Sequence, residues 1–147
     1  MKILLLILSF IIMTSCLVNL SRHDIETPKD TIFTLQWVLN KIDKMDFIYY
    51  FEELFTGDGN AIVKQFEKLI SSTESEEKKL WTKIQEMFKN IIIKLEKLEY
   101  TDEENAVAYC VYYFPDKYYV RNVKINLYKN RLGWRIIEIK GIDPANP

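Results

Sequence analysis

The sequence predicts an α+β domain in which N-terminal helices pack against an antiparallel sheet of about four strands. Up to Lys89, apolar residues recur at the three- and four-residue spacing of amphipathic helices. After Lys89 the pattern changes to alternation and to β-branched residues, which favour strands. One face of the predicted sheet is charged. The helices are therefore expected to cover the other face.

The first predicted helix begins at Thr27-Pro28-Lys29-Asp30. Thr27 can cap the free N–H groups, and proline suits the first helical position. Asp30 favours the positive end of the helix dipole. Three further helices are predicted. They are a short one from Phe47 to Phe55 that ends at Gly57-Asp58-Gly59-Asn60, one over residues 62–70, and one that Ser75 can cap.

Four strands are predicted, over residues 91–100, 106–114, 119–129 and 134–140. The segment from Ala106 to Phe114 carries almost no charge, so it is expected to be central or covered on both faces. Pro115-Asp116-Lys117 predicts a hairpin turn after it.

The N-terminal residues have the pattern of an export signal. Lys2 precedes an apolar run from Ile3 to Met13, which is too short to span a bilayer but fits a signal peptide. Met13-Thr14-Ser15-Cys16 resembles the lipobox of bacterial lipoproteins, although Met13 stands where leucine is usual. The resemblance implies cleavage before Cys16 and lipid attachment to its thiol. The alternatives are an ordinary cleaved signal peptide and an uncleaved anchor reaching Leu20.

This interpretation divides the chain into a signal peptide (1–15), a tether (16–26), one folded domain (27–141) and a tail (142–147). It predicts a bacterial cell-envelope protein anchored to a membrane by lipid, on the periplasmic face or the outer membrane rather than in the cytoplasm. His23, the single histidine, falls in the predicted tether, where no pocket is expected to surround it.

The charge pattern argues against nucleic-acid binding. The chain has 20 basic and 21 acidic residues with no basic cluster, whereas nucleic-acid binding needs one. No phosphate-binding glycine loop, metal-ligand spacing or serine-nucleophile motif is present, so neither a cofactor nor a metal is expected. With Cys16 lipidated, Cys110 has no disulfide partner and is expected to be an inert buried thiol.

Residues 27–140 resemble the NTF2-like (cystatin-like) superfamily, and in particular small lipoproteins of the DUF4878 type. The resemblance is carried by Thr27-Pro28, Lys44-Met45-Asp46-Phe47, Val123-Lys124-Ile125-Asn126-Leu127 and Gly133-Trp134-Arg135-Ile136. It implies a curved sheet wrapped around the first helix as a cone, with an apolar cavity at the open end. Enzymes of this superfamily place Asp, His or Tyr in that cavity, but the predicted domain has no histidine.

The tyrosines around the predicted hairpin are candidates for a partner or ligand surface, since tyrosine combines apolar area with a polar tip. Ordinary sheet packing is the alternative. Alternation places Tyr109 and Tyr113 on one face and Tyr112 on the other. The candidates are Tyr109, Tyr112, Tyr113 and Tyr119.

Two charged residues join these candidates. Alternation predicts Arg121 on the same face as Val123, where it either pairs with an anionic ligand or reaches water at the strand end. Glu138 shares its parity with Trp134 and Ile136. If buried there it would have a raised pKa and could act as a base; otherwise it lies on the exposed face.

The sequence thus favours a non-enzymatic, lipid-anchored domain that binds a protein partner or a small apolar ligand. The alternative is a small-molecule-binding NTF2-like enzyme that uses an acid in its cavity. A weaker third hypothesis is an inhibitor-like module acting through the loop at 115–118. An open pocket containing Glu138 or Arg121 would favour the enzyme, and a filled interior with exposed tyrosines would favour the binding domain.

Overall fold

The computed structural model describes residues 22–141, and in them the helices precede the strands. The helices are α2 (Pro28–Leu39), α3 (Phe47–Glu53), α4 (Asn60–Ser71) and α5 (Ser75–Phe88). The strands are β1 (Ile92–Tyr100), β2 (Asn105–Phe114), β3 (Tyr119–Asn130) and β4 (Gly133–Gly141). Short 3-10 turns are η1 (Arg22–Ile25), η2 (Gly57–Gly59) and η3 (Pro115–Lys117).

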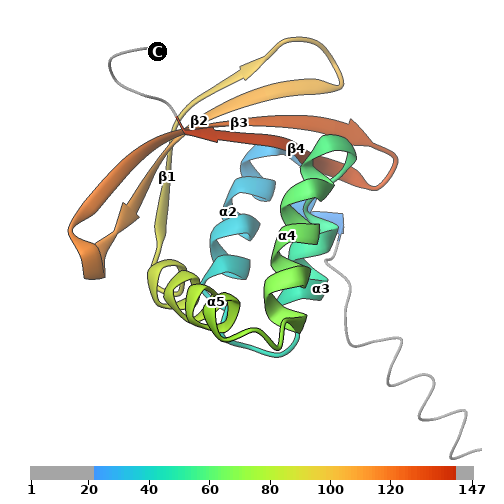
Figure 1. Cartoon of the computed structure of the whole chain (residues 1–147). Coiled ribbons are helices and arrows are strands. Elements are labelled where there is room, and N and C mark those ends of the chain that lie inside the picture. The colour runs from blue at the N-terminus through green and yellow to red at the C-terminus, as the bar shows by residue number, and fades with distance from the viewer. Residues whose placement is uncertain (1–21, 142–147) are drawn as a thin grey trace, which may run out of the picture.

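The four strands form one antiparallel sheet in the order β1-β2-β3-β4. The sheet is not closed, and the described helices lie on one side of it (Figure 1). The predicted α+β fold with N-terminal helices is confirmed. Because each strand pairs with its neighbour in sequence, the connections are short hairpins.

Helix α2 begins as predicted. The Thr27 hydroxyl accepts a hydrogen bond from the Asp30 N–H at 3.1 Å, and the Asp30 carboxylate accepts one from the Thr27 N–H at 3.0 Å. This reciprocal pair satisfies two N–H groups that have no partner within the helix. Pro28 occupies the first helical position, where its missing N–H costs nothing.

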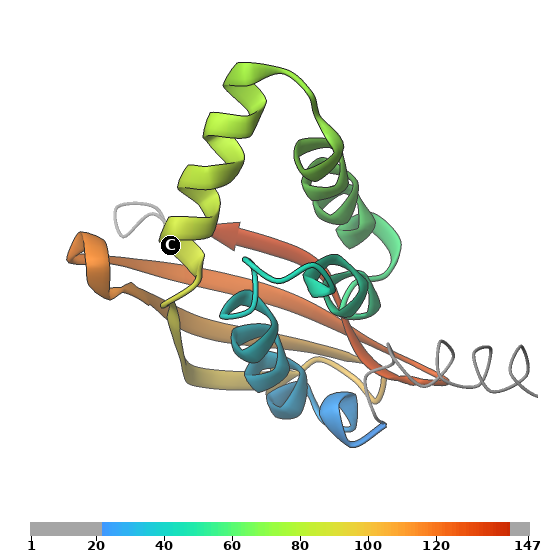
Figure 2. The same ribbon diagram turned by 90° about the horizontal axis from the view of Figure 1, so that it is seen from below.

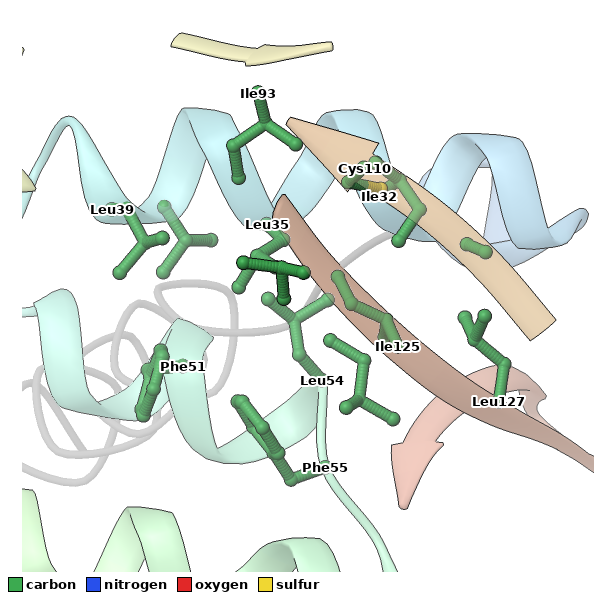
Figure 3. Close-up of a cluster of buried hydrophobic side chains, with 14 of the residues drawn as sticks. Ile32, Leu35, Leu39, Phe51, Leu54, Phe55, Ile93, Cys110, Ile125 and Leu127 are labelled. Atoms are coloured by element: carbon green, nitrogen blue, oxygen red, sulfur yellow. The ribbon is translucent and has the colours of Figure 1, made fainter. Parts of the chain in front are cut away.

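The core lies between α2, α3 and the inner face of the sheet. Leu35 is 1% exposed, Leu54 0% and Ile125 0%. Figure 3 shows side chains from both helices and from the strands pointing toward one another; it labels Ile32, Leu35, Leu39, Phe51, Leu54, Phe55, Ile93, Cys110, Ile125 and Leu127. The covered face of the sheet is therefore filled by helix side chains.

The end of α3 differs from the prediction, which continued that helix to Phe55. The helix ends at Glu53, and the next residues run alongside β4, where Phe55 forms a parallel bridge with Ile136. The Ile136 N–H donates to the Leu54 carbonyl at 2.7 Å, and the Thr56 N–H donates to the Ile136 carbonyl at 3.0 Å. Pairing with β4 satisfies these backbone groups while Leu54 remains in the core.

Two smaller expectations are also corrected. Ser75 is the first residue of α5 rather than its cap, and Glu74 precedes it without a side-chain capping bond. Ile25 was expected in a tether but is 3% exposed and belongs to the core. The Thr34 hydroxyl donates to the Asp24 carbonyl at 2.7 Å, which fixes η1 on α2. The folded domain therefore includes residues before Thr27.

Candidate functional site

The outer face of the sheet has no helix over it within residues 22–141 (Figures 1 and 2). Burial alternates strictly along β2, and the residues that point outward are partly exposed. These residues form an apolar and aromatic row through the middle of the face, here named the tyrosine stripe: Val107, Tyr109, Val111 and Tyr113. Tyr109 and Tyr113 share this face and Tyr112 takes the other, as predicted from alternation.

Charged side chains border the tyrosine stripe on its β1 side. The Lys97 ammonium lies 5.8 Å from the centroid of the Tyr109 ring, within range of a cation–π interaction. The same lysine forms an ion pair and hydrogen bond with Glu99, and this contact is the main reason that the pKa of Glu99 lies below its ordinary value. Lys94 pairs with Glu96 at 2.7 Å.

The β3 side of the stripe is polar. Val111 pairs with Asn122, Tyr109 with Lys124 and Val107 with Asn126 across the two strands. An aromatic row bordered by charged and polar side chains has the composition of a protein-interface core with its rim. Val107 and Val111 were not among the predicted site residues, although their two-residue spacing from the tyrosines was visible in the sequence.

Glu138 lies on this open face, which is the exposed alternative, and the inward position implied by its parity with Trp134 and Ile136 is wrong. The register shifts between Asn126 and Leu127, which pair with Glu138 and Ile136 respectively. Ile137 is thus an extra residue in β4, and it reverses the parity that the sequence implied. The Glu138 carboxylate accepts a hydrogen bond from the Asn126 amide at 2.7 Å.

The charge environment of Glu138 is also opposite to that of a buried base. Its carboxylate pairs with the Lys140 ammonium at 2.8 Å. This contact, and then the Asn126 hydrogen bond, hold the pKa of Glu138 below its ordinary value. A general base that works near neutrality needs a raised pKa. Glu138 therefore does not fit the role of a cavity acid.

Arg121 and Tyr119 lie apart from the tyrosine stripe. Arg121 follows the inward parity of Val123 but is exposed, and its guanidinium group covers Gly141, since a Cβ atom there would lie 2.5 Å from Nη2. Tyr119 is 49% exposed, and its ring centroid is 5.8 Å from that of Phe114. The predicted candidates therefore do not converge on one site.

Tyr112 belongs to the core rather than to a surface. It is 6% exposed, and its buried hydroxyl has no hydrogen-bond partner among the described residues. Burial raises the pKa of Tyr112 well above its ordinary range. Neighbouring Cys110 is 2% exposed, and burial raises its pKa to about 12, as expected for an unreactive thiol.

Three of the surface hollows over the described residues bear on these candidates. One of about 600 Å³ lies between the β1–β2 and β3–β4 turns, and one of about 410 Å³ lies between α3 and Arg135. The third, of about 670 Å³, follows the free edge of β1 beside Phe33 of α2. Neither Arg121 nor Glu138 lines any of these three hollows.

Sequence comparisons do not place this chain in a known protein family. No protein-family model matches the chain, and no curated protein matches it. A solved structure, the intermembrane space region of the chloroplast protein ARC6, aligns at 14% identity over 76% of this chain and 95% of that one, with a TM-score of 0.24. Across residues 22–141, no helix has both the length and the apolar character needed to cross a bilayer.

Proposed function

We propose that this chain is a bacterial cell-envelope lipoprotein, anchored through Cys16, whose domain binds a protein partner without catalysing a reaction. The domain is proposed to be NTF2-like, on the motifs given above. The observation that carries the binding role is the uncovered sheet face with the tyrosine stripe along its centre. Cys16 lies outside the described residues, so the anchor rests on the leader sequence alone.

The shape of this face favours a protein over a small ligand. Small-molecule sites are concave and bury most of the ligand. None of the three hollows is centred on the tyrosine stripe, although Tyr113 borders the one beside β1. Protein interfaces are flatter, and tyrosine is among the residues that contribute most to their affinity.

The position of η1 determines where the proposed tether joins the domain. A Cβ atom on Gly133 would lie 2.5 Å from the Ile25 carbonyl oxygen, so the chain enters the domain beside the β3–β4 turn. The β2–β3 hairpin lies at the opposite end of the sheet (Figure 2). Residues 16–21 can span at most about 20 Å. On this proposal the point at which the chain enters the domain lies within about 20 Å of the bilayer surface.

The anchor is tested with Cys16→Ser in the full chain, expressed in a bacterial host with Cys110→Ser as the matched control. Lipidation predicts that unchanged chain and C110S enter the detergent phase with added acyl mass, while C16S keeps its leader and gains no lipid mass. An unmodified thiol at position 16 in the unchanged chain would refute the anchor without bearing on the binding face.

The binding face is tested in cells with a photo-crosslinking amino acid in place of Val111, and with the same residue in place of Thr82, exposed on α5, as the control. The proposal predicts a discrete adduct from position 111 alone. It also predicts at least a tenfold loss of this adduct with Tyr109→Ala and Tyr113→Ala together, since truncating a tyrosine at a hot spot near the centre of an interface costs ~2 kcal/mol or more. Equal adducts from both positions would contradict it.

A further inference from the structure

The free edge of β1 carries a pattern that matches itself when reversed. Reading from residue 94 to residue 99, the order is Lys-Leu-Glu-Lys-Leu-Glu. Laid antiparallel to a second copy about the midpoint of residues 96 and 97, Lys94 stands opposite Glu99, Leu95 opposite Leu98, and Glu96 opposite Lys97. Opposite charges and apolar pairs facing each other across strands are stabilising, and like charges there are destabilising.

This match depends on an irregularity in β1. In a regular strand, residues 96 and 97 would point to opposite faces, and a two-fold related copy could not bring them together. The register of β1 against β2 shifts between Leu95 and Lys97, so that Glu96 is the extra residue. Glu96 and Lys97 are both exposed in consequence, whereas Leu95 and Leu98 are both partly buried on the inner side.

The backbone groups at this edge are positioned for such pairing. The Ile93 N–H points away from β2, since it donates to the Gln36 side chain at 2.6 Å. At the other end of the strand, the Thr101 N–H points toward β2 and donates to the Asn105 carbonyl at 3.0 Å. By alternation from both ends, Leu95 and Leu98 direct their N–H and C=O groups outward. Within residues 22–141 no strand pairs with them.

An apolar surface lies beneath the same edge. The hollow of about 670 Å³ beside β1 is lined by Phe33, Leu95 and Leu98 among others, and Phe33 is 53% exposed. A second strand laid along β1 would cover this hollow from the side, and two-fold symmetry would bring the second copy's Phe33 to the same inner surface. Burial of apolar side chains beside the new backbone bonds would favour the pairing.

We infer that β1 is a self-association edge, at which two copies of this chain pair antiparallel over residues 94–99 to form one continuous eight-stranded sheet. The occupant is a second copy because the charges complement themselves. A protective edge commonly carries lysines that repel a second copy, whereas this edge alternates in sign. Gln36 sets the limit of the pairing, since it already occupies the Ile93 N–H.

The inference is tested by sedimentation of the purified full chain in detergent across a concentration series. The unchanged chain forms a dimer. K94E/K97E leaves only acids at the edge, and E96K/E99K leaves only bases, so each weakens self-association at least about tenfold. An equimolar mixture of the two variants restores the dimer as a heterodimer, and the fourfold variant K94E/E96K/K97E/E99K restores it alone.

K78E/K79E on α5 is the matched control, because it changes the net charge equally at exposed positions away from β1. This control leaves dimerisation unchanged. A monomeric unchanged chain at every concentration, or a dimer that K94E/K97E does not weaken, overturns the inference. The mixture also tests whether the variants are folded. If K94E/K97E and E96K/E99K failed to dimerise because they were misfolded, mixing them would not restore a dimer.

Discussion

The two edges of the sheet are protected in different ways. At the β4 edge, main chain covers main chain: Leu54 and Thr56 bond to both backbone groups of Ile136. At the β1 edge, side chains from α2 and from the residue that caps it bond to the main chain. Gln36 of α2 accepts from the Ile93 N–H, and Asn40, the C-cap, donates to the Ile91 carbonyl at 3.0 Å. A single side chain can form hydrogen bonds with only one or two backbone groups of the strand edge. The rest of the β1 edge carries charged side chains and, on our inference, pairs with a second copy of the chain.

Main-chain cover requires closer packing than side-chain cover does. The backbone of Gly59 lies so near β4 that a Cβ atom there would be 2.5 Å from the Ile136 carbonyl oxygen. The side-chain cover at β1 has no comparable constraint. Changes at the β4 edge should therefore lower the free energy of unfolding more than changes at the β1 edge.

Leu54→Ala should have the largest effect. The side chain is 0% exposed in the core, so its removal leaves a cavity and costs ~2–5 kcal/mol of unfolding free energy. Denaturant unfolding of the variant measures this loss. Leu132→Ala, at a residue 63% exposed in the β3–β4 turn, is the control and should change stability by no more than ~0.5 kcal/mol. Equal effects from the two would refute the packing described for the β4 edge.

Gly59→Ala should come next. The added methyl meets the Ile136 backbone of β4 rather than a movable side chain, so η2 and β4 must move apart, at a cost of ~1–3 kcal/mol. Asp58→Ala, at the exposed neighbouring residue, tests whether any change in η2 has the same effect. Thermal unfolding of both proteins decides it, and a Gly59→Ala variant as stable as the unchanged chain would contradict the close approach.

Gln36→Ala should cost less. It leaves the Ile93 N–H without its acceptor, and because the position is only partly buried the expected loss of unfolding free energy is ~1 kcal/mol, the lower end for such a group. Gln36→Glu keeps an acceptor oxygen and should retain most of the stability. Amide hydrogen exchange at Ile93 is the sharper measurement: exchange should accelerate in Q36A and not in Q36E. An unchanged exchange rate of the Ile93 amide in Q36A would show that the Gln36 hydrogen bond does not protect this edge.

The smallest effect concerns the charges on β1. The hydrogen bond and ion pair with Lys97 lower the pKa of Glu99, so this pair stabilises the fold above the unfolded pKa of the carboxyl group. That contribution is lost as the pH falls through the folded pKa. Titration of the Glu99 carboxyl by NMR should give a pKa below the ordinary value, and Lys97→Met should move it upward. If the pKa of Glu99 does not change in K97M, Lys97 is not the cause of its lowering.

Local signals in the sequence predicted most elements of the fold. The capping residues of α2 act within one turn of the chain, so Thr27 and Asp30 could be assigned without any tertiary information. Alternation along β2 likewise separated Tyr112 from Tyr109 and Tyr113 correctly. These features depend on neighbours a few residues away, and the sequence contains those neighbours.

The failures share a different cause. Phe55 was predicted in a helix because its spacing from Phe51 is helical, but pairing with Ile136, far along the chain, determines its conformation. Alternation counted through Ile137 gives Glu138 the parity of the inner face, and only the register with β3 reveals that extra residue. Ile25 has no periodic neighbours to mark it as part of the core. Contacts with distant parts of the chain decided each of these positions, through strand pairing for Phe55 and Glu138 and through packing for Ile25.

Alkylation of the buried Cys110 thiol can report how often the core opens beneath the sheet. In a C16S variant it is the sole cysteine, and its thiol, with a pKa of about 12 and 2% exposure, is closed to alkylating reagents while β2 stays paired. The alkylation rate then counts excursions that separate the central strands from α2. Because Cys110 pairs with Leu95 on β1, dimer formation at that edge should slow the reaction as protein concentration rises.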